Sequence, residues 1–103
     1  MSEPVYQLVI ARGDVHTEGW YQLSKEEQDR IWAETQAADE RVGAEYVLFC
    51  NSRWANEGTP VWGIVKYPSI EAVQQVAAQD LEWFRYTNFE TILGTKMPET
   101  PEP

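Results

Sequence analysis

The stretch AEYVLFCNSRWANEGTPVWGIVKY (residues 44–67) decides the fold, because two apolar runs in it flank a turn. The runs at residues 44–54 and 60–67 are rich in β-branched and aromatic residues, which are typical of β-strands. Between them, ANEGT (residues 55–59) supplies turn residues, and Gly58 can adopt the positive φ that many turns require. The stretch therefore predicts a β-hairpin.

A helix is predicted on each side of this hairpin. Ser24 and Glu27 form the S-x-x-E pattern of a capping box, which marks a helix start, and Gly43 is suited to end that helix. After the hairpin, Ser69 is placed to cap a second helix. Helical spacing predicts that one face of this second helix carries Ile70, Val73, Ala77, Leu81 and Phe84.

The remaining apolar runs, at residues 5–12 and 88–96, predict a first and a last strand. The resulting order β-α-β-β-α-β is the ferredoxin-like arrangement, of the α+β class. Right-handed crossovers give the strand order 4-1-3-2 in a four-stranded antiparallel sheet with two helices on one face. We expect one ferredoxin-like domain over residues 1–96, followed by a disordered Pro- and Glu-rich tail at residues 97–103.

The predicted strands are apolar on both faces. In the first strand, for example, Val9 and Ala11 alternate with Leu8 and Ile10. An antiparallel sheet with one face in water should instead alternate apolar and polar residues. Two helices cover one face, and a second copy of the sheet related by two-fold symmetry is the simplest cover for the other. We therefore expect a homodimer in the form of a dimeric α/β barrel. The alternative is an open face with scattered apolar residues.

The composition narrows the choice of partners. Eight basic residues against 17 acidic ones give a net charge of −9, which argues against nucleic-acid and anionic-membrane partners. Cys50 is the chain's one cysteine and cannot form an internal disulfide, which fits a reducing compartment. The N-terminus shows no signal-peptide pattern, and no apolar stretch approaches the roughly 20 residues of a membrane span. We expect a cytoplasmic protein.

Much of the chain resembles the darcynin-like small bacterial proteins of the dimeric α/β-barrel superfamily. The resemblance rests on an aromatic and apolar framework rather than on a catalytic motif. The matching pieces are GWYQLSKEEQ (residues 19–28), VWGIVKYPSIEAVQQV (61–76) and WFRYTNFETILG (83–94). The superfamily includes cofactor-independent monooxygenases, lactone isomerases, polyketide cyclases, haem-degrading enzymes and ligand binders. The resemblance therefore implies a fold and leaves the reaction open.

The predicted topology gathers reactive side chains at one end of the sheet, where the first strand ends and the last begins. His16, the chain's one histidine, lies there in a predicted loop and can move a proton near neutral pH. Arg85 offers a planar fork to an anionic oxygen, and Tyr86 is a second proton carrier. We predict these three as catalytic. The predicted ligand-binding residues at this end are Arg12, Trp20, Asn51, Arg53, Trp54 and Trp62.

Structural roles are the alternative for these residues. Trp62 is then a core or interface residue, Trp54 a dimer contact, Arg85 one half of a surface ion pair, and His16 a polar loop residue. The chain lacks a Gly-rich phosphate loop and a nucleotide-binding motif. One histidine and one cysteine do not make a usual zinc site, and haem would need His16 or Cys50 as its axial ligand. We expect no metal and no cofactor.

Three functions compete at this point. The first is a cofactor-free enzyme of isomerase, cyclase or monooxygenase type that acts on a small aromatic or polyketide-like compound. The second is a protein that binds such a ligand without turnover. The third is an accessory structural dimer in which tryptophans such as Trp20, Trp54 and Trp83 fill the pocket. An enclosed cavity would favour the first two.

Overall fold

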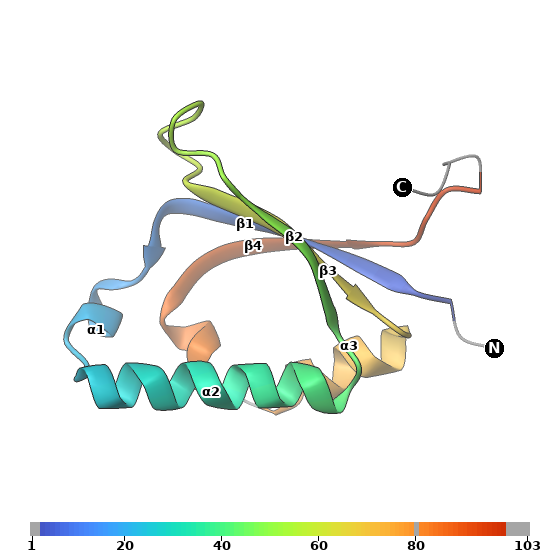
Figure 1. Ribbon diagram of the computed structural model, residues 1–103, viewed down its shortest axis with the longest axis horizontal. Coiled ribbons are helices and arrows are strands. Elements are labelled where there is room, and N and C mark those ends of the chain that lie inside the picture. Colours follow the sequence, from blue (N-terminus) through green and yellow to red (C-terminus); the bar gives the residue numbers. More distant parts are fainter. Residues whose placement is uncertain (1–2, 80, 99–103) are drawn as a thin grey trace.

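The hairpin predicted from residues 44–67 is present in the computed structural model, which describes residues 3–79 and 81–98. The elements in chain order are β1 (Val5–His16), α1 (Glu18–Tyr21), α2 (Lys25–Arg41), β2 (Glu45–Asn51), β3 (Val61–Tyr67), α3 (Ile70–Ala77), η1 (Glu82–Arg85) and β4 (Thr87–Gly94). The described strands form an antiparallel four-stranded sheet in the order β2-β3-β1-β4 (Figure 1). The α+β class and the predicted strand order are thus confirmed. Most of the tail predicted at residues 97–103 lies outside the described residues.

Helices α2 and α3 lie on the same face of the sheet, as predicted (Figure 1). Each begins at its predicted cap: the Ser24 hydroxyl accepts a hydrogen bond from the Glu27 amide, and the Ser69 hydroxyl accepts one from the Ala72 amide. Gly43 follows α2 with a φ of 79°, in the left-handed region that glycine adopts readily. In the described part of the chain, no helix is both long and apolar enough to span a membrane.

The second predicted helix is shorter than expected. α3 ends at Ala77, and the chain turns through an extended Leu81 into the short 3-10 helix η1. The expectation of one apolar face running to Phe84 is wrong, because Leu81 is buried in the core whereas Phe84 is 53% exposed. The turn allows η1 to pack against α2 and brings Trp83 into contact with Trp32.

The first strand is longer than expected, which corrects the position of His16. β1 pairs with β4 up to Ala11 opposite Phe89, and pairing resumes at His16 opposite Thr87 after an irregular segment. Gly13, with a φ of 70°, lies in this segment and donates its amide hydrogen bond to the Gly58 carbonyl in the hairpin loop. His16 therefore lies at a strand end rather than in a free loop.

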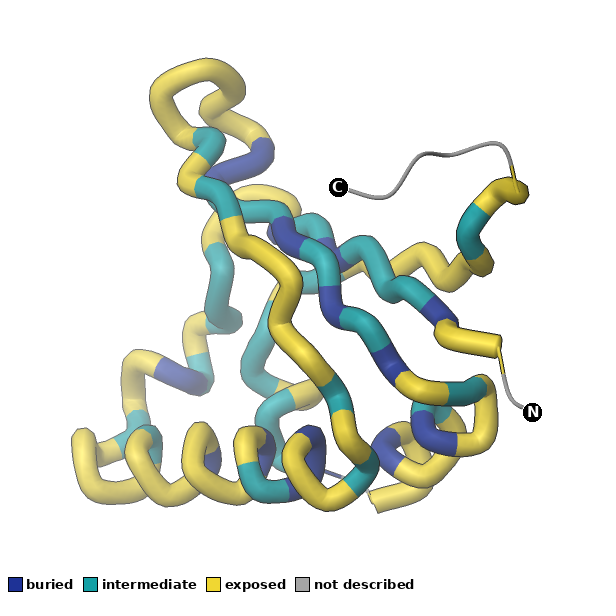
Figure 2. The backbone as a smooth tube through the Cα atoms, turned by 45° about the vertical axis from the view of Figure 1, so that its right-hand side comes forward, coloured by how far each residue is buried: buried dark blue, intermediate teal, exposed yellow. Residues whose placement is uncertain are grey.

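The two faces of the sheet are covered differently. The helix-covered face contributes Val9, Val65 and Tyr67 to the core, which α2 and α3 complete. On the open face, cross-strand pairs such as Leu8 with Ile64 and Ile10 with Trp62 are apolar, as the sequence predicted. Nearly all residues of β2 are exposed (Figure 2). The open face is therefore an apolar surface that the described residues of this chain leave largely uncovered.

Candidate functional site

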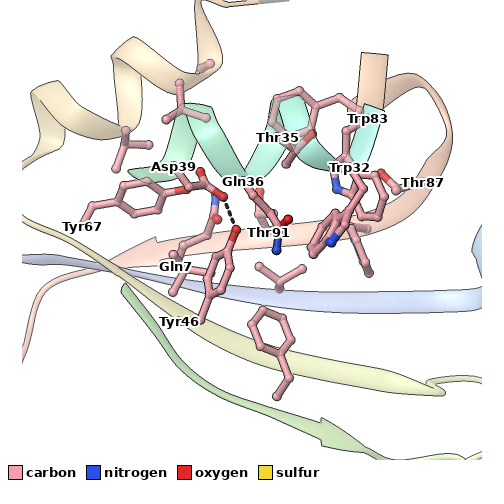
Figure 3. A pocket seen from close by; sticks show the side chains of 18 of the residues that line it. Gln7, Trp32, Thr35, Gln36, Asp39, Tyr46, Tyr67, Trp83, Thr87 and Thr91 are labelled. Atoms are coloured by element: carbon pink, nitrogen blue, oxygen red, sulfur yellow. Dashed lines mark hydrogen bonds between the residues drawn. The ribbon is translucent and has the colours of Figure 1, made fainter. Parts of the chain in front are cut away.

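A cavity of about 750 Å³ lies between the sheet and the helix layer (Figure 3). We call it the inner cavity. Its volume falls in the range of about 300–1,000 Å³ that is usual for small-molecule sites. Its walls are mainly apolar and aromatic, with a few polar groups. The residues that line it are Gln7, Val9, Val15, Trp32, Thr35, Gln36, Asp39, Tyr46, Phe49, Val61, Val65, Tyr67, Val73, Val76, Ala77, Trp83, Phe84, Thr87, Phe89 and Thr91.

A buried carboxyl group lies in the wall of the inner cavity. Asp39 comes from α2 and is 9% exposed. Its Oδ2 atom accepts a hydrogen bond from the Tyr46 hydroxyl of β2 (Figure 3). A second phenol, that of Tyr67 in β3, lies beside this carboxyl group in the wall of the cavity (Figure 3). The helix layer and two strands thus meet at one polar cluster in an otherwise apolar wall.

The environment changes the acidity of all three groups. Burial raises the pKa of Asp39 above its ordinary value, and the neighbouring phenols of Tyr46 and Tyr67 oppose this rise in part. Burial and the neighbouring carboxyl group raise the pKa of Tyr67 to about 12 and that of Tyr46 further. Both phenols therefore remain protonated donors near neutral pH. Asp39 takes up a proton more readily than an aspartate in water.

Lysine, arginine, histidine and cysteine are absent from the described lining of the inner cavity. The remaining polar groups of the lining are neutral amides and hydroxyls, among them Gln7, Gln36 and Thr91. The inner cavity thus offers no side chain suited to be the usual axial ligand of haem. In the described residues, no group of three histidines, cysteines or acidic residues is arranged to hold a metal ion.

A second, shallower pocket of about 270 Å³ surrounds His16, and we call it the outer pocket. Its lining residues are His16, Trp20, Gln28, Asp29, Trp32 and Trp83. The His16 ring stacks on Trp20, with 4.4 Å between the ring centroids, and meets Trp83 edge-on at 5.2 Å. Its Nδ1 atom lies 3.2 Å from the backbone carbonyl oxygen of Tyr86. His16 is therefore half-buried in an aromatic cluster.

The structure brings part of the predicted site together. His16, Trp20 and Tyr86 lie close together beside the outer pocket, and the Tyr86 and Trp20 rings lie 6.1 Å apart. Arg85, the third predicted catalytic residue, ends η1 with an exposed side chain. Neither Arg85 nor Tyr86 is among the residues that line the two pockets.

The other predicted ligand-binding residues lie near the hairpin and on the open face. Arg12 donates hydrogen bonds to Glu90 at 2.5 Å and to Thr59 at 3.2 Å. The Asn51 side chain accepts a hydrogen bond from the Arg53 amide. The Trp54 side chain is 86% exposed beyond β2, and Trp62 pairs with Ile10 and Cys50 across the strands. None of these residues lines the inner cavity or the outer pocket.

The polar cluster of Asp39, Tyr46 and Tyr67 was not predicted from the sequence. A signal for it was present, because Asp39 follows Ile31 and Thr35 at the four-residue spacing of one helical face. An acidic residue on an inward face must be buried, and a buried carboxyl group needs partners. Tyr46 lies in β2 and Tyr67 in β3, whereas Asp39 lies in α2. The three side chains therefore come together only through the packing of these strands against the helix.

Comparison with solved structures shows which fold this is. A mutant chlorite dismutase from Candidatus Nitrospira defluvii matches 95% of this chain with a TM-score of 0.64 and 19% identity, but the match covers only 42% of the dismutase chain. The RPA0582 protein matches 97% of this chain and 86% of its own, with a TM-score of 0.62 and 14% identity. A mutant of SnoaB, a cofactor-independent oxygenase from Streptomyces nogalater, matches 99% of this chain and 100% of its own, with a TM-score of 0.56 and 18% identity.

These similarities identify the fold. The chain has the architecture of a dimeric α/β-barrel domain. It spans about two fifths of the length of the chlorite dismutase chains that it matches. No family model and no curated protein matches the sequence.

Proposed function

We propose that this protein binds a small aromatic compound in the inner cavity and transforms it without a cofactor, as an isomerase, cyclase or monooxygenase. The observation that carries the proposal is the inner cavity itself, in which aromatic and apolar walls surround a buried carboxyl group. SnoaB, which shares the fold over its whole length, is described as a cofactor-independent oxygenase, and this supports the reaction class.

The chemistry that these residues can supply is proton transfer. Asp39, in its ionised form, accepts a proton from an acidic O–H or C–H of the ligand and can return it at another position, so that an isomerisation balances. The Tyr46 phenol holds the carboxyl group in place, and the phenols of Tyr46 and Tyr67 both remain neutral. In this proposal the proton-accepting role passes from His16 to Asp39, because His16 lines the outer pocket rather than the inner cavity.

Two variants test binding in the inner cavity. Thr91 of β4 lines the cavity, so Thr91→Trp should fill part of it and weaken binding, whereas Thr95→Trp makes the same change just beyond the strand. Binding to the native state raises apparent stability, so thermal shift with a panel of hydroxylated one- to four-ring aromatics reports it. We expect shifts for the wild type and Thr95→Trp and none for Thr91→Trp. Equal shifts for the two variants would contradict the proposal.

Turnover is a separate question. We expect at least one ligand of the panel to be converted, by chromatography and mass spectrometry, in the presence of air and without an added cofactor. Tight binding without conversion across the panel would favour a ligand-binding protein over an enzyme.

We also propose that the chain belongs to the darcynin-like proteins and is a homodimer. The support for a dimer is the apolar open face, where Leu8, Ile64 and Ile92 pair across neighbouring strands and Ile92 is 60% exposed. Sedimentation equilibrium should give about twice the 11.9 kDa mass of the chain. Ile64→Lys should dissociate the dimer and Thr95→Lys should not, because a buried unpaired charge is costly. A monomeric wild type would contradict the proposal.

A further inference from the structure

The inner cavity has one acidic group and no basic one in its described lining. Asp39 is the one residue of that lining whose side chain can carry a charge near neutral pH. The predicted arginines do not compensate it there, because Arg12, Arg53 and Arg85 are exposed and none of them lines the cavity. The chemistry of the cavity is therefore unlike that of a site built to hold an anionic oxygen.

We infer that Asp39 sets the ligand specificity of the inner cavity, which selects an uncharged aromatic compound with a hydroxyl group and rejects carboxylates. This inference rests on the function proposed above and names the substrate class of the same site. The ligand hydroxyl donates a hydrogen bond to the Asp39 carboxylate while its rings contact the aromatic wall.

The hydrogen-bond arrangement leaves room for such a donor. A carboxylate accepts about four hydrogen bonds, and the Tyr46 phenol supplies one of them. The oxygens of Asp39 therefore retain acceptor capacity on a side chain that lines the cavity. The Tyr46 phenol donates to Asp39 and is occupied, so it does not serve as a donor to an anionic ligand. A hydroxyl group fits this arrangement because it brings the donor that the cluster lacks.

Charge explains the selection against ions. A ligand carboxylate would lie near the Asp39 carboxylate in an apolar surrounding, with no cationic side chain in the described lining to offset the repulsion. A ligand ammonium would be attracted to Asp39, but it would lose its hydration, and two phenols already stabilise the carboxylate. A neutral hydroxyl gains a charge-assisted hydrogen bond without bringing a second charge out of water.

Four probes of similar shape test the inference: naphthalene, 2-naphthol, 2-naphthoate and 2-naphthylmethylammonium. Dissociation constants near pH 7 come from NMR titration of the full ¹⁵N-labelled chain, and the amides that shift locate the site. We expect 2-naphthol to bind about tenfold more tightly than naphthalene, and 2-naphthoate to bind most weakly. The shifted amides should cluster around Asp39 rather than His16.

Asp39→Asn removes the charge and keeps the shape of the side chain. In this variant 2-naphthol should bind about tenfold more weakly, 2-naphthoate should bind more tightly than to the wild type, and naphthalene should be unchanged. Glu34→Gln removes a negative charge from the exposed side of the same helix and should leave all four constants unchanged. If Asp39→Asn does not fold, the order of the four probes on the wild type still decides.

The possible results separate this inference from the proposed function. Binding of naphthalene and 2-naphthol with equal affinity in the inner cavity would overturn the role of Asp39 and leave the proposed function intact. Tightest binding of the carboxylate or of the ammonium would overturn it as well. If none of the four probes binds and the wider panel of aromatics gives no thermal shift, the proposed function itself fails.

Discussion

The inner cavity and the outer pocket share a wall, formed by Trp32 and Trp83, and differ in every other respect. The outer pocket is shallow and contains His16, the residue that looks most reactive in the sequence. The volume of the inner cavity, about 750 Å³, is nearly three times that of the outer pocket, about 270 Å³. The acidic residue in the described lining of the inner cavity is Asp39, in the middle of the chain. A conspicuous residue and a well-formed cavity need not coincide.

The difference has a physical origin. His16 is held by ring contacts and by a hydrogen bond to backbone, so its surroundings stabilise a fixed position in an aromatic cluster. Asp39 is buried beside two neutral phenols, so its surroundings change its proton affinity. Groups with a perturbed pKa in a cavity are the stronger candidates for chemistry.

Removing the shared wall should have the largest effect. Trp83→Leu takes away ring contacts with Trp20, Trp32 and His16, and we expect a loss of about 2 kcal/mol in the free energy of unfolding. Urea denaturation measures this loss. Trp54→Leu is the matched control, because Trp54 is 86% exposed, and it should change stability by less than about 0.5 kcal/mol. Equal losses would show that Trp83 is not a wall between two pockets.

His16→Ala should have a moderate effect, confined to the outer pocket. The variant loses the stacking on Trp20 and the contact with the Tyr86 carbonyl, which together should cost about 1 kcal/mol in denaturation experiments. Binding of aromatic ligands in the inner cavity should change less than about twofold, a free-energy change within the usual range for a site away from the ligand. A large loss of binding would return His16 to the functional site.

The smallest expected effect is the change in the pH dependence of stability in Asp39→Asn. Because the pKa of Asp39 is raised in the folded state, its contribution to stability is fully present below its ordinary value of 3.8 and is lost as pH rises through the raised value. Asp39→Asn should therefore gain stability relative to the wild type, by about 1 kcal/mol or less, between about pH 3 and pH 7. Glu34→Gln is the control. A relative loss over this range would mean that Asp39 is stabilised as an anion.

The fold could be predicted from the sequence because its signals are local. Ser24 and Ser69 cap the helices where the pattern placed them, and right-handed crossovers between the predicted strands gave the order of the sheet. The failures came where tertiary contacts override local pattern. Leu81 is not helical and is buried in the core. His16 belongs to β1 because it pairs with Thr87, which lies 71 residues later in the sequence.

The candidate site was only half predictable. Topology alone brought His16, Trp20 and Tyr86 to one end, and the structure agrees. The cluster around Asp39 depends on the position of β2 relative to α2, which brings Tyr46 within hydrogen-bond distance of Asp39. The sequence pattern of side chains does not give this position. The acidic residue on an inward helical face was visible, but its partners were not.

One side of the inner cavity is formed by β2, a strand that can separate locally from the sheet. β2 is an edge strand in the order β2-β3-β1-β4, and its Tyr46 and Phe49 side chains line the cavity. The Phe49 ring packs directly on Gly63 of β3. A Cβ atom added at Gly63 would lie 2.1 Å from that ring, so this contact between β2 and β3 requires glycine. Edge strands open locally at lower free energy than central ones. Fraying of β2 would thus admit a ligand while β1 stays folded, and a ligand that joins Tyr46 to α2 would slow amide exchange along β2 above all other strands.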